Sequence, residues 1–224
     1  NAGYSYSGSI SLRRAVEKSS NVATYRLYEE LGTRTCMKYL EALNFKGLDK
    51  KDYKYNTTCL GGFTNGTTVV EMAAGYATIA NDGEYRTPDC IIKITDAKGN
   101  DIVPEDTSTK SVYSSSASRM MTSVLQSCVT AHVCQLDVDM PAACKTGTTN
   151  NYVDGWLCGY TPYYTTAVWV GMDVYKSVDN LKGNTYPASI WTNYMNKIHQ
   201  GLSRKEFESY LGDTESTTEA TTES

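Results

Sequence analysis

Apolar residues recur at the spacing of an α-helix near the start of the chain. Residues 11–17 begin with a serine that can cap a helix, and their apolar side chains fall on one face. The same spacing resumes over residues 22–31, and Gly32 follows as a C-terminal stop. The pattern therefore predicts two amphipathic helices separated by the polar turn Ser19-Ser20-Asn21.

Further helical segments and one hairpin are predicted along the middle of the chain. Helical spacing of apolar residues occurs over residues 35–43, 68–80, 116–129 and 188–199. The segment from Gly61 to Gly66 is typical of a loop, because glycine adopts backbone angles that other residues avoid. Residues 91–96 and 101–103 are predicted to form a β-hairpin with a turn at Gly99-Asn100.

Short apolar runs typical of strands follow in the last third of the chain. They span residues 142–146, 155–160 and 165–172, and Thr161-Pro162-Tyr163 supplies a turn between the last two. Segments joined this closely pair antiparallel. We therefore expect an α+β fold in which an antiparallel sheet is flanked by helices, with a helical subdomain.

Length and composition suit one folded domain with a tail. The chain has 224 residues, of which 40% are hydrophobic, and this is enough for one substantial core. We expect a domain over residues 1–202 and an extension over residues 203–224. The last twelve residues contain four acidic side chains and no basic one, so they account for the net charge of −4. This tail has too few apolar residues to become ordered by itself.

Charge and hydropathy exclude several classes of partner. Removing the four acidic residues of the tail leaves 21 acidic residues against 21 basic ones, so nucleic-acid binding is not expected. No apolar run approaches the ~18–20 residues of a membrane span. The chain opens on the polar residues Asn1-Ala2-Gly3-Tyr4 rather than on a signal sequence. We therefore expect the chain to be part of a longer protein, with any membrane anchor upstream of residue 1.

Cysteine and histidine patterns do not indicate a metal or cofactor site. The seven cysteines include no Cys-x-x-Cys pair and are irregularly spaced, so no metal and no cofactor are expected. We expect them to serve mainly as small buried side chains, and their disulfide state stays open. His132 and His199 fall in a loop and near a helix end, where structural roles are expected. A Ser-His-Asp triad is therefore not predicted.

Lys145-Thr146-Gly147-Thr148 is the sharpest chemical feature. It ends one predicted strand and precedes the strand that is expected to pair with it. A lysine at such an edge can hold a hydroxyl ready for proton transfer, and threonine hydroxyls can bind a carboxylate. Gly147 leaves room for another backbone against the strand. Taken alone, the tetrapeptide is also compatible with an ordinary surface turn.

The polar turn Ser19-Ser20-Asn21 can supply complementary groups. Ser19 offers a hydroxyl able to relay a proton, and Asn21 offers both a donor and an acceptor for orienting an amide. Polar groups fixed between two helices can face the lysine-bearing strand across a cleft. Taken alone, the turn is also explained as a helix cap.

Together these segments resemble the serine D,D-peptidases and β-lactamases, whose motifs are Ser-x-x-Lys, Ser-x-Asn and Lys-Thr-Gly. Residues 65–83 look like the helix between the second and third motifs of penicillin-binding proteins. Residues 145–149, followed by Asp154-Gly155-Trp156 and by Val168 to Asp173, are similar to the bifunctional class A enzymes. The resemblance covers roughly residues 1–200 in the family's order.

The chain departs from the family pattern at three places. None of its fourteen lysines has a serine three residues before it, so the nucleophile motif is absent, and in the family this motif lies upstream of the segment that begins at Asn1. Cys144 stands where family members usually have glycine, and Thr130-Ala131-His132 replaces a stretch that contains glycine. We therefore expect residues 1–224 alone to form no acyl-enzyme.

The resemblance implies acyl transfer on peptidoglycan stem peptides. A serine attacks the D-Ala-D-Ala bond, D-Ala leaves, and an amine of a neighbouring stem resolves the acyl-enzyme, while β-lactams acylate the same serine. Ser19 and Lys145 would handle the proton, and Asn21 would orient the acyl amide. Thr146 and Thr148 would hold the terminal carboxylate, with the Thr148 backbone N–H aimed at the oxyanion, and Gly147 would bind the substrate beside them.

The resemblance also implies that the intact protein has a glycosyltransferase domain and a membrane anchor. Its place would be the extracytoplasmic face of the bacterial cell membrane, next to the wall. The alternative is a non-catalytic module that binds peptidoglycan or β-lactams, and a Ser-x-x-Lys sequence upstream would decide between the two. A secreted β-lactamase is less favoured, because the class A-like similarity continues after Thr148.

Overall fold

A three-stranded antiparallel sheet forms the centre of the structure. The computed structural model describes residues 8–91, 93–103 and 108–210. Strands β5 (Ala143–Thr148), β6 (Gly155–Tyr160) and β7 (Thr165–Val170) pair in that order, so β5 is an edge strand within the described residues. The predicted antiparallel pairing is confirmed, and β5 continues two residues beyond the predicted end at residue 146.

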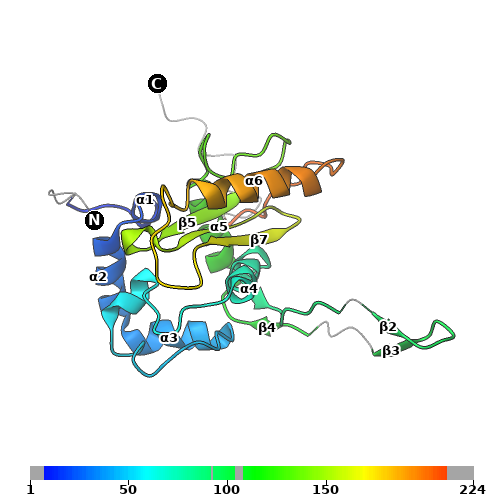
Figure 1. Ribbon diagram of the computed structural model, residues 1–224, viewed down its shortest axis with the longest axis horizontal. Helices are drawn as coiled ribbons and strands as arrows, with labels where there is room; N and C mark the ends of the chain where they lie inside the picture. The colour runs from blue at the N-terminus through cyan, green and yellow to red at the C-terminus, as the bar shows by residue number, and fades with distance from the viewer. Residues whose placement is uncertain (1–7, 92, 104–107, 211–224) are drawn as a thin grey trace.

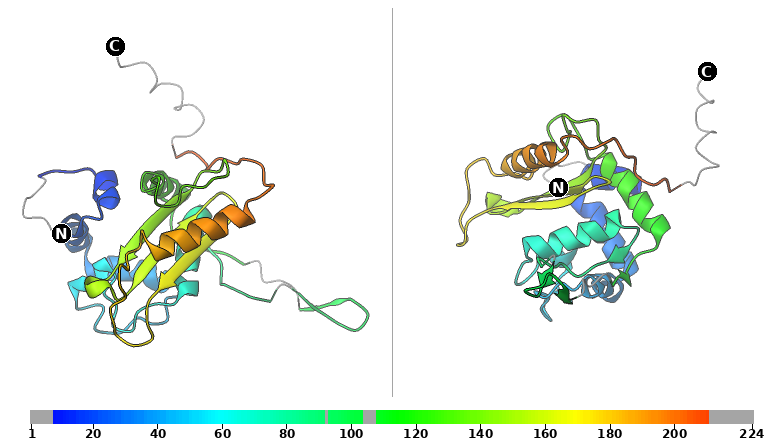
Figure 2. Two further views of the ribbon diagram at one scale, coloured as in Figure 1. Left: turned by 45° about the horizontal axis from the view of Figure 1, so that its top comes forward. Right: turned by 90° about the vertical axis from the view of Figure 1, so that its right-hand side faces the viewer.

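Helices cover both faces of this sheet, as the predicted α+β layout requires (Figures 1 and 2). Helix α6 (Tyr186–Ile198) packs on β6 and β7 from one side. Helix α4 (Val69–Ala80) packs on the same two strands from the other side, and α5 (Ser115–Gln126) packs beside it on β5. Helix α4 begins with a capping box, in which Thr68 and Glu71 satisfy each other's backbone N–H groups.

Close packing of α6 on the sheet depends on a missing side chain. Trp191, Met195 and Leu157 are fully buried between the helix and β6. An ideal Cβ at Gly159 would lie 2.8 Å from the Cβ of Cys144 and 3.0 Å from Cζ2 of Trp191. Any larger residue at Gly159 would therefore push the indole away from the sheet.

The opposite face combines apolar packing with two polar links. Tyr160 and Leu125 are buried there, and the Tyr160 hydroxyl is 2.8 Å from Oγ1 of the buried Thr122. Arg119 of α5 forms an ion pair of 2.6 Å with Asp82, just beyond the end of α4. These contacts hold α4 and α5 together beneath the sheet.

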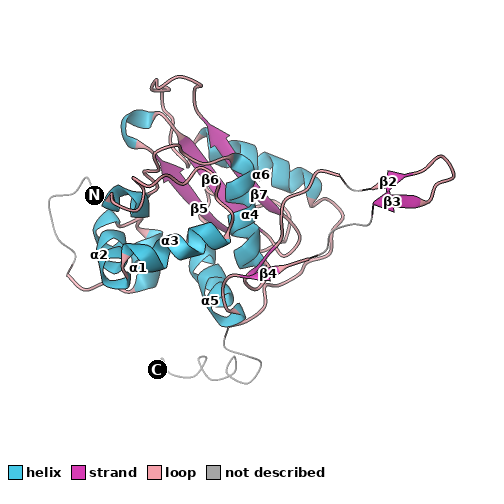
Figure 3. Cartoon of the chain, turned by 90° about the horizontal axis from the view of Figure 1, so that it is seen from below, coloured by secondary structure: helices cyan, strands magenta, loops and turns pink. Residues whose placement is uncertain are grey.

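The first helices form the predicted helical subdomain at one end of the molecule (Figure 3). They are α1 (Leu12–Glu17), α2 (Asn21–Leu31), α3 (Thr33–Ala42) and the short 3₁₀ helix η1 (Asn56–Leu60). Their positions agree with the predicted helices at residues 11–17, 22–31 and 35–43. None of the helices in the described ranges is both long and apolar enough to cross a bilayer.

A slender hairpin projects from the body, at the right of Figure 1. Its strands β2 (Ile94–Thr95) and β3 (Asp101–Val103) pair antiparallel, which confirms the predicted hairpin, although residue 92 of its first segment lies outside the described residues. Strands β1 (Glu84–Tyr85) and β4 (Lys110–Ser111) also pair antiparallel. The sequence did not predict this pair, because two residues are too few to show an alternating pattern.

Residues beyond α6 return to the sheet. Phe207 packs edge-on against Tyr160, with ring centroids 5.6 Å apart. The domain boundary expected at residue 202 stays a prediction. The acidic tail expected to lack order falls within residues 211–224, outside the described residues.

Candidate active site

The polar turn between α1 and α2 is built from two helix caps. Ser19 N–H donates to the Val16 carbonyl (3.0 Å) and Ser20 N–H donates to the Ala15 carbonyl (2.9 Å). This pair of hydrogen bonds is a Schellman motif, which closes α1. Ser20 then caps α2, and its hydroxyl accepts a hydrogen bond of 3.4 Å from the Ala23 N–H. The predicted helix-cap role is therefore met by Ser20, and Ser19 is left available for chemistry.

Ser19 occupies a backbone position that usually belongs to glycine. Its φ is 48°, in the left-handed region, at the residue where a Schellman motif normally has glycine. For an ordinary residue this conformation costs about 1 kcal/mol. Strained backbone of this kind is concentrated at functional sites.

Helix α5 connects the turn to the sheet. Arg13 of α1 donates hydrogen bonds to the backbone oxygen (2.6 Å) and the hydroxyl (2.9 Å) of Ser123 in α5. Helix α5 in turn packs on β5. The two contacts fasten α1 to α5 and α5 to β5, so the Ser19 turn that follows α1 is tied to the edge strand through α5.

Lys145 and Ser19 meet although 126 residues separate them in the chain. Lys145 Nζ donates a hydrogen bond to Ser19 Oγ and another, of 3.1 Å, to the Thr146 carbonyl. Because the Ser19 oxygen is the acceptor, its own proton is free to be donated elsewhere. This geometry is suited to passing a proton from the ammonium group through the hydroxyl.

The surroundings of Lys145 lower the pKa of its ammonium group. Burial lowers the pKa of the Lys145 ammonium group, because the charged form loses solvation, and the nearby Cys128 and Cys144 thiols oppose this with a smaller effect. An amine whose pKa is lowered in this way is better suited to exchange protons near neutral pH.

A pocket of about 450 Å³ joins the turn to the edge strand. Its lining comes from the end of α1, from the segment after α5, from β5 and from two loops beyond β5. The lining residues are Glu17, Ser19, Cys128, Thr130, Val133, Cys144, Lys145, Thr146, Thr148, Tyr152, Lys182 and Asn184. Four of the six predicted site residues are therefore brought together here.

Two predicted site residues do not line this pocket. Asn21 is the first residue of α2 and is exposed, two positions beyond Ser19. Gly147 faces Trp156, whose Cβ would be 3.3 Å from a Cβ added at the glycine. The roles predicted for both residues stay predictions.

The structure also shows pocket residues that sequence reasoning missed. Lys182 and Asn184 come from the loop before α6, and Tyr152 comes from the short η2 helix (Asn150–Tyr152). Gly183 N–H donates a 2.9 Å hydrogen bond to Thr148 Oγ1, and this contact brings the loop onto β5. Only tertiary structure shows this link, because the two residues are 35 positions apart and belong to no common motif.

His199 and most of the cysteines do not line this pocket. His199 is buried, and its ring nitrogens are each 2.7 Å from a partner, Thr161 Oγ1 and the Met195 carbonyl. These contacts give His199 a structural role, as predicted. All seven cysteines are free thiols; three are buried, three are half-buried and Cys90 is exposed.

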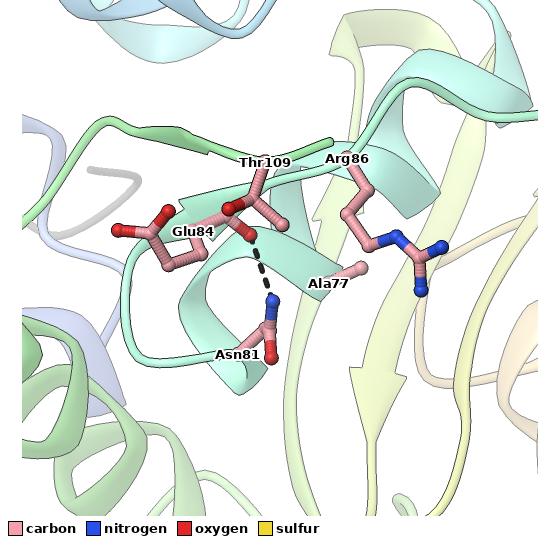
Figure 4. A pocket seen from close by; sticks show the side chains of 5 residues that line it. All are labelled: Ala77, Asn81, Glu84, Arg86 and Thr109. Carbon is pink, nitrogen blue, oxygen red and sulfur yellow. Dashed lines mark hydrogen bonds between the residues drawn. The ribbon is translucent and has the colours of Figure 1, made fainter. Parts of the chain in front are cut away.

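A second hollow lies near the end of α4 and contains none of the predicted site residues (Figure 4). Ala77, Asn81, Glu84, Arg86 and Thr109 line it. The Asn81 side-chain amide donates a 3.1 Å hydrogen bond to the Glu84 carbonyl, which braces the turn after the helix. The Glu84 and Arg86 side chains point in different directions, so they do not converge on one ligand (Figure 4).

Comparisons with known proteins show which family the chain resembles. The family model of the penicillin-binding protein transpeptidase domain matches residues 1–200. Penicillin-binding protein 4 of Bacillus subtilis is 33% identical over 187 residues, which cover 82% of this chain and 30% of that protein. Penicillin-binding protein 1A of Clostridium novyi is 33% identical over 219 residues, which cover 93% of this chain and 24% of that protein. The chain thus spans about a quarter to a third of the length of these relatives.

Solved structures show the same architecture. The penicillin-binding protein PonA1 of Mycobacterium tuberculosis superposes with a TM-score of 0.80 at 25% identity, covering 92% of this chain and 60% of that one. Its complex with penicillin V superposes with a TM-score of 0.78. Because the family model spans residues 1–200, the chain belongs to the penicillin-binding protein transpeptidase family.

Proposed function

We propose that the protein containing this chain is a serine D-Ala-D-Ala transpeptidase that cross-links peptidoglycan stem peptides. The hydrogen bond from Lys145 to Ser19 carries this proposal, because it joins the second and third family motifs in one pocket. The attacking serine would come from a Ser-x-x-Lys motif upstream of residue 1. The same site would accept β-lactams, as the penicillin V complex of PonA1 suggests for a related domain.

The Lys145–Ser19 pair would deliver the proton that the leaving amine needs. When the serine attacks the peptide carbonyl, the C–N bond breaks and the amine of D-Ala must gain a proton. Ser19 can donate its hydroxyl proton and take another from Lys145, which already donates a hydrogen bond to its oxygen. The lowered pKa of Lys145 makes this transfer easier.

Thr146 and Thr148 would hold the terminal carboxylate of the stem peptide. Both line the pocket beside Lys145. The Thr148 oxygen already accepts a hydrogen bond from Gly183, so its hydroxyl proton remains available for a carboxylate oxygen. In the same scheme Asn21 orients the acyl amide, Gly147 lies beside the substrate backbone, and the Thr148 N–H stabilises the oxyanion.

The domain organisation of the intact protein is proposed from the relatives of this chain. Their greater length and the relatives named penicillin-binding protein 1A support a bifunctional class A enzyme with a glycosyltransferase domain and a membrane anchor. Such an enzyme would act at the extracytoplasmic face of the bacterial membrane and could also have D-Ala-D-Ala carboxypeptidase activity.

A non-catalytic module that binds peptidoglycan or β-lactams is the alternative. The transpeptidase and the non-catalytic module differ in whether a covalent penicillin adduct forms.

Lys145→Ala in the full-length protein should slow acylation by fluorescent penicillin at least about 100-fold, because the relay loses its proton source. Lys197→Ala is the control, since Lys197 is exposed in the last turn of α6 and does not line the pocket. The measurement is the rate of covalent labelling on denaturing gels. Residues 1–224 alone should remain unlabelled. Equal labelling of Lys145→Ala and wild type, or an unlabelled wild type, would contradict the proposal.

Ser19→Gly and Ser19→Ala should separate the hydroxyl from the backbone strain. Both remove the relay, so both should slow labelling to a similar extent. Glycine tolerates the left-handed backbone and alanine does not, so the glycine variant should be more stable by about 1 kcal/mol. Urea unfolding measures the difference. Wild-type labelling rates in either variant would exclude Ser19 from the proton path.

The labelling rate should fall on the alkaline side as Lys145 loses its charge. Burial lowers the pKa of Lys145 from the ordinary value of 10.5, so the midpoint of the fall should lie below 10.5. In Lys145→Arg the guanidinium stays charged over this range, and the fall should be absent from its residual activity. Initial labelling rates between pH 7 and 10.5 test this. An unchanged alkaline fall in Lys145→Arg would assign it to another group.

A further inference from the structure

The loop before α6 forms a fixed wall of the pocket. Lys182 N–H donates a 2.9 Å hydrogen bond to Thr185 Oγ1, and the next N–H, that of Gly183, donates one of 2.9 Å to Thr148 Oγ1. Thr185 Oγ1 also donates to the Asn180 carbonyl (3.0 Å). Hydrogen bonds on both sides of Lys182 therefore fix its backbone relative to β5.

Gly183 allows this loop to lie directly on the edge strand. A Cβ at Gly183 would be 2.6 Å from the Trp156 carbonyl oxygen and 2.7 Å from that of Gly147. Both neighbours are backbone atoms of the sheet and cannot easily move aside. The adjacent Lys182 lines the pocket.

Tyr152 supports the Lys182 side chain. The Lys182 ammonium nitrogen lies 5.9 Å from the centroid of the Tyr152 ring, a distance typical of a cation–π contact. Tyr152 has a left-handed backbone, with φ 55°, and its carbonyl accepts a 3.0 Å hydrogen bond from the Val178 N–H. The two loops that supply this pair are therefore linked to each other.

Among the charged residues that line the pocket, Lys182 is the one whose ammonium group has no ion-pair or hydrogen-bond partner within the described residues. The other charged lining residues have partners: Glu17 binds Arg14 at 3.0 Å, and Lys145 binds Ser19. No ion pair within residues 8–91, 93–103 and 108–210 includes Lys182, and its side chain is exposed. A cation held against an aromatic ring at the wall of a binding pocket is suited to attract an anionic group on the ligand.

We propose that Lys182 is a specificity-determining residue, whose ammonium group favours acyl donors and β-lactams that have a second carboxylate in addition to the terminal one. This inference rests on the proposed function and extends it. In the proposed scheme Thr146 and Thr148 already hold the terminal carboxylate and Lys145 serves the proton relay, so Lys182 adds recognition of a further anionic substituent. The interaction is solvent-exposed and should be weakened by salt.

The test uses the full-length protein and two penicillins that differ in one group. Carbenicillin is benzylpenicillin with an additional carboxylate on the side-chain α carbon, and both share the ring carboxylate. The measured quantity is the ratio of their second-order acylation rate constants. Variants are Lys182→Met, the conservative Lys182→Arg, and Lys197→Met as the control for loss of a charge outside the pocket.

Lys182→Met should lower the carbenicillin-to-benzylpenicillin ratio by about threefold to fivefold, the effect of one exposed ion pair. Lys182→Arg should restore the ratio, Lys197→Met should leave it at the wild-type value, and added salt should reduce the wild-type ratio towards that of Lys182→Met. A ratio unchanged in Lys182→Met overturns the inference, whether the two rates fall together or stay constant. An adduct absent from the wild type with both penicillins would overturn the proposed function, and this inference with it.

Discussion

The hydrogen bond between the Lys145 ammonium group and the Ser19 hydroxyl joins the helical subdomain to the edge of the sheet. It requires a half-buried lysine to remain close to a residue with left-handed backbone geometry, and each condition has an energetic cost. Burial lowers the pKa of the Lys145 ammonium group, while the strained turn presents the Ser19 oxygen to it. The features that cost stability are thus the ones that suit proton transfer.

The remainder of the fold keeps these two groups in place. Arg13 fastens α1 to α5, and α5 packs on the strand that contains Lys145. On the other side of the strand, Gly159 admits the indole of Trp191, and Gly183 admits the loop before α6. Edge strand β5 is therefore held from both faces, while its outer edge borders the pocket.

The main helices and strands could be predicted from the sequence, because local patterns such as helical spacing, caps and short apolar runs determine them. The meeting of Ser19 and Lys145 across 126 positions was expected from the family resemblance, and the structure brings the two side chains together. The wall formed by Lys182 and Tyr152 could not be predicted. It depends on a glycine with no room for a side chain and on a hydrogen bond between loops, and neither leaves a periodic pattern in the chain.

The most direct test of the Lys145–Ser19 proton relay is a double-mutant cycle on acylation by penicillin in the full-length protein, combining Ser19→Ala with Lys145→Ala. If the two residues form one proton relay, the second substitution should slow a protein that already has the first by less than about threefold, since residues acting as a unit are not additive. Losses that multiply in the double variant would show that the two groups act independently, and would contradict the relay.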